Sequence, residues 1–337
     1  MKYNPMLLAG DIGGTKTDLA IFSNEEGPGA PLVQAEVHSA DYSSLQALAR
    51  EFLTKVSLPV DRACFAVAGP VIGGRAKTTN LPWVMDEDSL AKELNLRSVH
   101  LMNDLEAIAE SIPILRDSEV RTLNAGQPAP RGVIGVIAPG TGLGESFGAW
   151  DGSRYVARAS EGGHADFAPT DERQIGLLRR MLERFDHVSV EHVCSGVGIP
   201  HIYEYLRDVE HIPETPEVAQ LIASARDPSS VIFASAVDPN NPSKLCSAAV
   251  DMFVSILGSE AANLALKVLA TGGVYLAGGI PMRILRVLQT PRFMESFKRK
   301  GRLSELMERI PIHVVIARVA LIGAAARGLE RLKEEAR

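Results

Sequence analysis

Cysteine is scarce in this sequence, and the few cysteines do not form pairs. The three residues, Cys64, Cys194 and Cys246, are odd in number, lie far apart and include no C-x-x-C motif. This pattern argues against a disulfide framework and against a cysteine-rich zinc site, and it fits a reducing compartment. We therefore expect a cytoplasmic protein.

Positive charge and long apolar runs are also lacking. The net charge of -6 at pH 7 leaves no excess of basic side chains for a face that binds nucleic acid. The stretch before Asp11 is too short for a signal peptide, and no segment reaches the roughly 20 apolar residues that span a bilayer. We therefore expect neither nucleic acid nor a membrane as a partner.

The chain does have the length and the apolar content for two hydrophobic cores. Its 337 residues compare with roughly 100–200 residues in a typical domain, so we expect two domains. The longest helical pattern, 247–270, is apolar enough for a central buried helix. Residues 227–242 are expected to form a loop, and a helix is expected to begin within 189–192.

A glycine turn between two apolar runs lies near the N-terminus. Residues 7–23 read LLAGDIGGTKTDLAIFS, an order that predicts a β-hairpin. The glycines let the backbone approach a ligand closely, and successive N–H groups in such a turn form a concave anion site. Asp11 at the edge of the turn suits a hydrated Mg²⁺. We interpret this stretch as a phosphate-binding hairpin for a nucleotide, with an ordinary hairpin as the alternative.

A second copy of this order lies in the middle of the chain. The apolar run 133–138 and Pro139 precede the turn G-T-G-L-G at 140–144, and a strand pattern follows over 146–150. Two glycine turns in separate halves indicate a duplicated domain with the ligand between the copies. The two turns would hold opposite ends of a triphosphate.

Four further stretches carry candidate chemistry, each with a structural alternative. Asn103-Asp104 follows a buried strand, where open α/β sheets place their chemistry, although Asp104 could simply cap the next helix. The stretch 160–169 predicts a polar binding loop or a solvated turn. Glu191 would favour the dipole of an expected helix. Gly278-Gly279 permits close approach of a purine, or is a plain strand-to-helix turn.

Together these stretches resemble the bacterial glucokinase family, within the actin, hexokinase and Hsp70-like ATPase superfamily. Seven motifs occur in the order that this family has, and they span nearly the whole chain. They are D-I-G-G-T at 11–15, T-N-L-P-W at 79–83, N-D at 103–104, G-T-G-L-G at 140–144, E-G-G-H-x-D-F-A-P at 161–169, Glu191 before C-S-G, and A-G-G-I at 277–280. Each motif is weak alone, and their joint order argues against chance.

The resemblance implies an α/β protein with a duplicated ribonuclease H-like (actin-like ATPase) fold and two domains with an interdomain cleft. Residues 1–114 plus 318–337 would form a small domain and residues 115–317 a large one. It also implies a homodimer. No cysteine cluster lies near His164, so the zinc site of the repressor-and-sugar-kinase group is missing, and the plain glucokinase branch is favoured.

The resemblance further implies roles for individual residues. Asp104 would be the general base that faces the 6-hydroxyl of the sugar. The sugar would be bound by Asn80, Asn103, Asp104, Glu161, His164 and Glu191. ATP would be bound by Gly10, Asp11, Ile12, Gly13, Gly14 and Thr15, by Gly140, Thr141 and Gly142, and by Gly278 and Gly279 near adenine. Asp11 would hold Mg²⁺ through water, whereas Glu161 and His164 would carry no metal.

The implied activity is the ATP-dependent phosphorylation of D-glucose to D-glucose 6-phosphate, a step of glycolysis. Carboxylates, an amide and an imidazole suit a pyranose, because every sugar hydroxyl both donates and accepts hydrogen bonds. One alternative is a kinase of another hexose or of an amino sugar. Another is a non-catalytic sugar sensor, which would need a DNA-binding segment that the residues before the hairpin leave no room for. Lys16 replaces the asparagine of many glucokinases and would either reach a phosphate or point into solvent.

Overall fold

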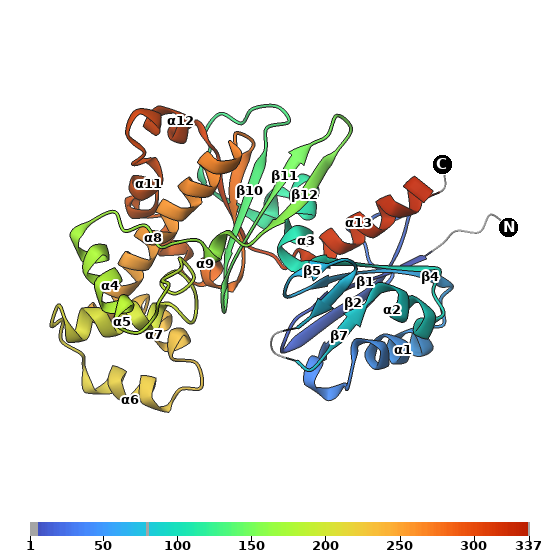
Figure 1. Ribbon diagram of the computed structural model, residues 1–337, viewed down its shortest axis with the longest axis horizontal. Coiled ribbons are helices and arrows are strands. Elements are labelled where there is room, and N and C mark those ends of the chain that lie inside the picture. The colour runs from blue at the N-terminus through green and yellow to red at the C-terminus, as the bar shows by residue number, and fades with distance from the viewer. Residues whose placement is uncertain (1–5, 79–80, 336–337) are drawn as a thin grey trace. The chain divides into compact units, whose positions relative to one another are not determined.

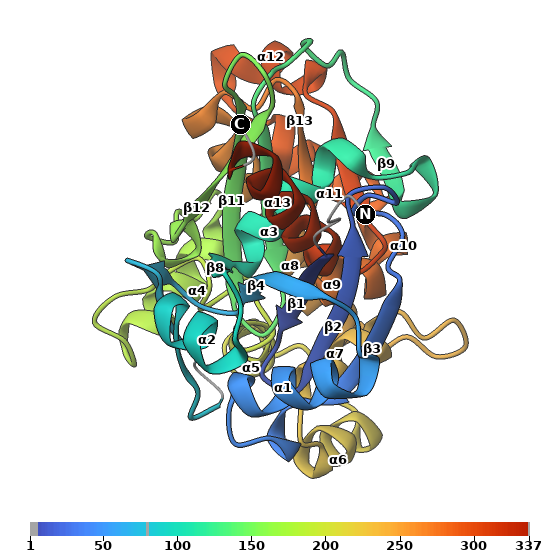
Figure 2. The same ribbon diagram turned by 90° about the vertical axis from the view of Figure 1, so that its right-hand side faces the viewer.

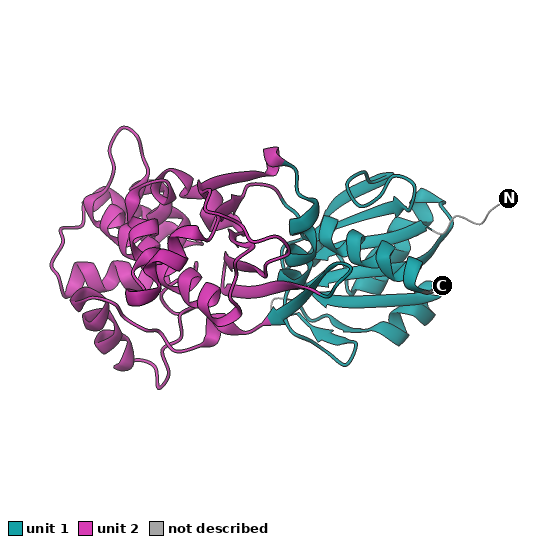
Figure 3. Cartoon of the chain, turned by 90° about the horizontal axis from the view of Figure 1, so that it is seen from above, with its two compact units in different colours: residues 1–116, 151–159, 318–337 teal, residues 117–150, 160–317 magenta. Residues whose placement is uncertain are grey.

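The computed structural model describes residues 6–78 and 81–335, which form two compact units. Unit 1 consists of Met1–Arg116, Asp151–Ala159 and Arg318–Arg337, and unit 2 of Asp117–Trp150 and Ser160–Ala317 (Figure 3). This division differs from the expected domain boundaries mainly at residues 151–159, which are grouped with unit 1. Each unit has its own sheet, and each is described separately below.

Unit 1 is built on a five-stranded sheet in the order β3-β2-β1-β4-β8 (Figures 1 and 2). Its strands are β1 (Met6–Ile12), β2 (Lys16–Ser23), β3 (Val33–His38), β4 (Val60–Val67) and β8 (Ser98–Asn103). A separate three-stranded sheet contains β5 (Val71–Ile72), β6 (Arg75–Lys77) and β7 (Val84–Asp86). β1 pairs antiparallel with β2 and parallel with β4, and β4 pairs parallel with β8.

The register of these parallel strands aligns their carboxyl ends. Ile12 of β1 lies opposite Val67 of β4, and Val67 lies opposite Asn103 of β8. The glycine turn after β1 and the Asn103-Asp104 pair after β8 therefore emerge at the same edge of the sheet. Open α/β sheets bind their ligands at this edge.

Helices cover both faces of the unit 1 sheet. Successive side chains of a strand point to opposite faces, so an apolar strand such as β1 packs into a core on each side. Leu8 and Ile12 of β1 pack into one core with helices α1 and α2, whereas Leu7 and Ala9 pack into another with α3 and α13. The helical segments are α1 (Leu45–Val56), α2 (Glu87–Leu94), α3 (Asp104–Ser111), α13 (Ala320–Glu335), η1 (Ser39–Asp41) and η2 (Ile112–Ile114). A Cβ on Gly323 would lie 1.7 Å from the Ala107 carbonyl oxygen, so glycine lets α13 approach α3 closely.

Unit 2 repeats the same arrangement around its own hairpin. β10 pairs antiparallel with β11 and parallel with β13, just as β1 does with β2 and β4, and the strand order within unit 2 is β11-β10-β13-β14-β9. The strands are β9 (Val120–Asn124), β10 (Ile134–Pro139), β11 (Leu143–Trp150), β13 (Gly273–Leu276) and β14 (Ile312–Val315), and β12 (Tyr155–Ser160) runs from unit 1 into unit 2. This repetition is the duplicated α/β topology that the sequence predicts.

The helices of unit 2 surround one long central helix, α8, which spans Lys244–Val268 (Figure 1). Among the described residues α8 alone is long and apolar enough to cross a membrane, contrary to the expectation that no segment is, but 83% of its apolar window is buried inside the protein. The other helical segments are α4 (Glu172–Leu182), α5 (Ile199–Asp208), α6 (Pro216–Ser224), α7 (Pro228–Ala236), α9 (Gly279–Arg283), α10 (Leu285–Leu288), α11 (Pro291–Lys298), α12 (Ser304–Arg309), η3 (Asp117–Glu119), η4 (Gly162–His164) and η5 (Gly301–Leu303).

Two local predictions in unit 2 are wrong. Residues 227–242 do not form a loop throughout, because Asp227 caps α7 by accepting a hydrogen bond from Ser229 N–H and Pro228 occupies the first helical position. No helix begins at 189–192 either. Glu191 lies in a turn whose backbone N–H groups bond to distant carbonyl oxygens, including that of Gly163.

Candidate active site

The first glycine turn, Gly13–Thr15, joins β1 to β2 in unit 1. Gly13 N–H donates to the Lys16 carbonyl oxygen over 3.1 Å, and a Cβ on Gly13 would lie 2.7 Å from that oxygen. Only glycine fits this position without opening the turn. Two other members of the predicted set sit in the sheet itself: Gly10 packs against Leu19 and Phe65, and the Ile12 side chain is fully buried.

A buried serine, Ser39, supports this turn through hydrogen bonds. Ser39 Oγ donates to the Gly13 carbonyl oxygen over 2.8 Å and lies 3.0 Å from Thr17 Oγ1. Ser39 N–H donates to the Thr15 carbonyl oxygen over 2.9 Å. The shape of the first turn is thus fixed by a neutral hydroxyl on η1, and no sequence motif marks that residue.

The carboxyl group of Asp11 lies at the mouth of the same turn. Its pKa is raised to about 7, chiefly by burial and also by the charges of Asp104 and Asp18, while Arg318 acts in the opposite sense. A cation would remove this penalty on the ionised form. In the described part of the chain, no three histidine, cysteine, aspartate or glutamate side chains are grouped to cage a metal. This donor set fits Mg²⁺, which keeps most of its waters and is commonly held by one carboxylate and substrate phosphates.

At the carboxyl end of β8 it is Asn103, and not Asp104, that caps α3. Asn103 Oδ1 accepts hydrogen bonds from Leu105 N–H at 2.9 Å and Glu106 N–H at 3.3 Å, and its Nδ2 donates to the Gly69 carbonyl oxygen at 3.0 Å. Asp104 is the first helical residue. The N-cap position thus belongs to Asn103, while Asp104 Oδ1 also accepts a hydrogen bond from Leu105 N–H at 3.0 Å. Asn103 retains one N–H of its amide for a ligand.

Lys16 lies beside the first turn in a network of charges. It forms an ion pair with Glu36, which also pairs with Arg318, and Arg318 lies 3.8 Å from Asp18. A cavity of about 420 Å³ is lined by Asp11, Asp18, Gln34, Glu36, Arg318 and Leu321. The Lys16 side chain is thus about half exposed and paired with a carboxylate. Asn80, the remaining predicted sugar ligand on this part of the chain, lies outside the described residues.

Three predicted sugar ligands come together in unit 2. His164 Nε2 lies 3.9 Å from Glu161 Oε2, and His164 Nδ1 lies 4.0 Å from Glu191 Oε1. Glu161 and His164 are carried by the η4 turn and are more than half exposed, whereas the Glu191 side chain is 23% exposed. Such a set offers carboxylate acceptors and a ring N–H to a polyhydroxylated ligand.

The second glycine turn, Gly140–Gly142, is held by the same segment that carries Glu191. Leu143 N–H donates to Glu191 Oε2 over 2.8 Å. Gly196 N–H donates to the Gly140 carbonyl oxygen at 2.8 Å, and Val197 N–H to that of Thr141 at 3.1 Å. The sequence motif located Glu191 but gave no sign of this contact with the turn.

A cavity of about 250 Å³ opens beside the second turn. It is lined by Gly140, Thr141, Gly196, Val197, Asp227, Ser229, Gly279, Ile280 and Arg283. Gly278 precedes it at φ +86°, where a Cβ would meet the Pro139 carbonyl oxygen at 2.8 Å, so a side chain is excluded there. The predicted adenine turn and the predicted phosphate turn thus border one cavity, along with residues of the 227–229 segment that the sequence analysis did not assign.

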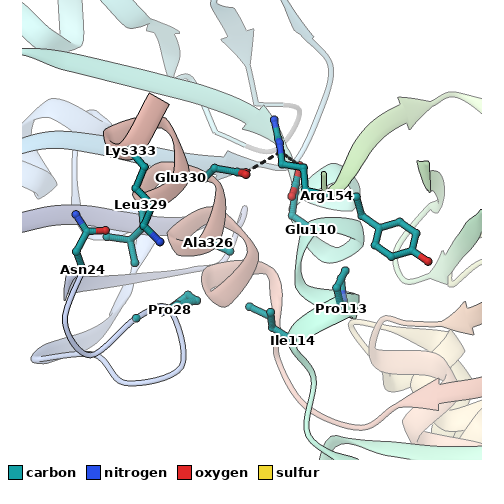
Figure 4. A pocket seen from close by; sticks show the side chains of 12 residues that line it. Asn24, Pro28, Glu110, Pro113, Ile114, Arg154, Ala326, Leu329, Glu330 and Lys333 are labelled. Carbon is teal, nitrogen blue, oxygen red and sulfur yellow. Dashed lines mark ion pairs between the residues drawn. The ribbon is translucent and has the colours of Figure 1, made fainter. Parts of the chain in front are cut away.

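A further cavity, of about 260 Å³, lies in unit 1 beside a group of ion pairs that stabilise the fold (Figure 4). Arg154 on its wall pairs with Glu330 at 2.7 Å, with Glu334 at 3.4 Å and with Glu110 at 3.9 Å. These ion pairs fasten residues 151–159 to α3 and α13, which accounts for their grouping with unit 1.

Comparison with known proteins identifies the family. The model of the family described as Glucokinase matches residues 8–330. A glucokinase of Nostoc punctiforme is 40% identical over 335 residues, which cover 95% of this chain and 98% of that protein. The chain belongs to the glucokinase family. The resemblance that the seven motifs indicated is thereby confirmed, and the chain is an enzyme of the kinase class.

Solved structures agree with the fold of this family. A glucokinase from an Antarctic psychrotroph is 30% identical, with a TM-score of 0.81 over 96% of this chain and 99% of that one. A ROK family glucokinase from Streptomyces griseus, solved in complex with glucose and AMPPNP, is 17% identical, with a TM-score of 0.60 over 96% of this chain and 99% of that one. At that identity the second similarity supports the fold alone.

Proposed function

We propose that this member of the glucokinase family transfers the γ-phosphoryl group of ATP to the 6-hydroxyl of D-glucose. The observation that carries the proposal is the similarity to glucokinases over almost the full length of both chains. The streptomycete neighbour was solved with glucose and AMPPNP, and the ligands proposed here are likewise a sugar and an adenine nucleotide. We further propose that the protein is cytoplasmic. We also propose that it is a homodimer, which sedimentation of the purified protein tests.

In the proposed reaction the 6-hydroxyl oxygen attacks the γ-phosphorus, and the bond from that phosphorus to the β,γ-bridging oxygen breaks. ADP leaves with that oxygen, and the hydroxyl proton passes to the Asp104 carboxylate. Phosphoryl transfer needs mainly alignment and stabilisation of charge on the γ-phosphoryl group. Mg²⁺, held by Asp11 through water, would supply part of that stabilisation.

The remaining residues would align the two substrates. Within the described ranges the N–H groups of Thr141 and Gly142 donate no backbone hydrogen bond, so these donors suit a phosphate. The cavity beside this turn would take the nucleoside. Glu161, His164 and Glu191 would bind sugar hydroxyls, and Asn103 and Asn80 are proposed as further sugar ligands.

The substitution Asp104→Asn tests the proposed base. It preserves size and polarity, so we expect glucose binding by calorimetry to change little, while formation of glucose 6-phosphate in a coupled assay falls by about 10³-fold. Near-normal turnover would exclude Asp104 as the base. A panel of hexoses and N-acetylated amino sugars at fixed ATP, repeated with ADP and polyphosphate, tests the substrates, and a clear preference for another sugar would overturn the assignment to glucose.

A further inference from the structure

Glu191 is a junction between the predicted sugar loop and the second glycine turn. Its backbone N–H donates to the Gly163 carbonyl oxygen over 2.9 Å. Its carboxylate accepts a hydrogen bond from Leu143 N–H over 2.8 Å. Its carbonyl oxygen accepts a hydrogen bond from Ser195 Oγ over 2.7 Å. The next residue, Gly196, donates its N–H to the Gly140 carbonyl oxygen. All of these contacts lie within unit 2.

The two segments joined by Glu191 also pack closely against each other. A Cβ on Gly142 would lie 2.3 Å from Glu191 Oε2, and a Cβ on Gly163 would lie 2.0 Å from the Leu143 carbonyl oxygen. The sugar loop therefore packs on the backbone of Leu143, and the turn packs on the Glu191 carboxylate, with glycine at both contacts. Displacement of the Glu191 carboxylate must move or release Leu143 N–H.

The two oxygens of this carboxylate serve different neighbours. Oε2 accepts from Leu143 N–H, whereas Oε1 faces His164 Nδ1 at 4.0 Å, on the side of the sugar ligands. A sugar hydroxyl that bonds to Oε1 would fix the rotamer of the whole carboxylate. It would thereby fix the peptide at Gly142-Leu143, on which the phosphate-binding N–H groups of the turn depend.

We propose that Glu191 couples sugar binding to nucleotide binding, so that glucose pre-orders the second phosphate turn and tightens the binding of ATP. This inference rests on the proposed function, since it requires Glu191 to contact the sugar. Coupling of this kind is reciprocal, so the nucleotide must tighten glucose binding by the same factor. Glu191 acts as a positioning residue for the nucleotide in addition to its proposed contact with the sugar.

The test measures the coupling factor directly, as the ratio of the dissociation constants of Mg-AMPPNP without and with saturating glucose. For the full-length protein we expect a ratio of about 5 or more. Glu191→Ala removes the acceptor of Leu143 N–H, so the ratio should fall to about 1 even when glucose is raised to saturation. Glu191→Gln keeps an oxygen that can accept from Leu143 N–H, so it should retain most of the coupling.

Glu161→Gln is the matched control, because Glu161 lies beside His164 but, among the described residues, forms no hydrogen bond or ion pair with the turn. It should weaken glucose binding while leaving the coupling ratio unchanged. Hydrogen exchange at Leu143 gives a readout without nucleotide: glucose should slow this amide in the parent protein and in Glu161→Gln, but not in Glu191→Ala. Equal ratios in Glu191→Ala and the parent, or equal loss in Glu161→Gln, would overturn the proposal. Failure of the parent protein to phosphorylate glucose would instead overturn the proposed function.

Discussion

The two glycine turns share a fold but are supported by different chemistry. In unit 1 the turn is held by the hydroxyl of Ser39, a buried neutral group that donates to the Gly13 carbonyl oxygen. In unit 2 it is held by the carboxylate of Glu191, which accepts from Leu143 N–H and also faces His164. A duplicated hairpin has thus kept its glycines while its supports diverged.

Because of this difference, a bound sugar can act on the support of the second turn, Glu191, but not directly on the support of the first turn, Ser39. The hydroxyl that supports the first turn is buried among its own partners and makes no contact with a predicted sugar ligand among the described residues. The carboxylate of the second turn is itself such a ligand. A change at the first turn should therefore alter nucleotide binding and stability, whereas a change at the second should also alter sugar binding.

The largest expected effects come from placing a methyl group in each turn. Gly13→Ala sets a Cβ 2.7 Å from a backbone oxygen, so the turn must open, and we expect unit 1 to lose up to about 3 kcal/mol of stability. Gly142→Ala sets a Cβ 2.3 Å from Glu191 Oε2, the end of a flexible side chain. We expect unit 2 to lose only about 1 kcal/mol, while glucose affinity falls about tenfold or more as the carboxylate is displaced.

The two tryptophans allow the units to be followed separately, because Trp83 lies in unit 1 and Trp150 in unit 2. Urea unfolding of each variant is measured by fluorescence in a Trp150→Phe background for unit 1 and in a Trp83→Phe background for unit 2. Gly140→Ala is the control for glucose affinity, since nothing lies within 4 Å of its Cβ. Loss of glucose affinity in Gly13→Ala equal to that in Gly142→Ala would contradict the comparison.

A carboxyl group beside each turn has a pKa near 7, and the one in unit 2 should make stability depend on pH. Glu145, 1% exposed on β11, has its pKa raised to about 7 by burial and by the charge of Glu260, with Lys267 acting in the opposite sense. The folded protein therefore keeps this proton to a higher pH than the unfolded chain does. The free energy of unfolding should fall as pH rises from about 4.5 to about 7 and then level off.

Glu145→Gln should remove this contribution. The free energy of unfolding of unit 2 in this variant, relative to the parent, should therefore increase by about 2 kcal/mol between pH 5 and pH 8. The measurement is urea unfolding of unit 2, reported by Trp150, across that range. Glu295→Gln, at an exposed position on α11, is the matched control and should follow the parent curve. A Glu145→Gln curve parallel to that of the parent would show that this carboxyl is already ionised at low pH.

The sequence predicted both hairpins because their signals are local: apolar runs flank glycines whose spacing leaves the chain little choice. It failed where a residue's surroundings come from distant segments. The helical pattern around Glu191 gave way to a turn because the N–H of that residue bonds to Gly163. Likewise, no local signal distinguishes Asn103 from Asp104 as the helix cap, or pairs Arg154 with carboxylates on two helices.

The smallest expected effect concerns the neutral support of the first turn. Ser39→Ala removes the hydrogen bond to the Gly13 carbonyl oxygen and the contact with Thr17, which should cost unit 1 about 1 kcal/mol. Thr17→Val removes only the second contact, and because the two hydroxyls share one bond the double variant should lose less than the sum of the single losses. The loss of stability in Ser39→Ala and in Thr17→Val should be independent of glucose and of pH between 5 and 8. Each variant should raise KM for ATP and leave KM for glucose unchanged. A parallel rise in KM for glucose would mean that the first turn also responds to the sugar, and the contrast with Glu191 would then fail.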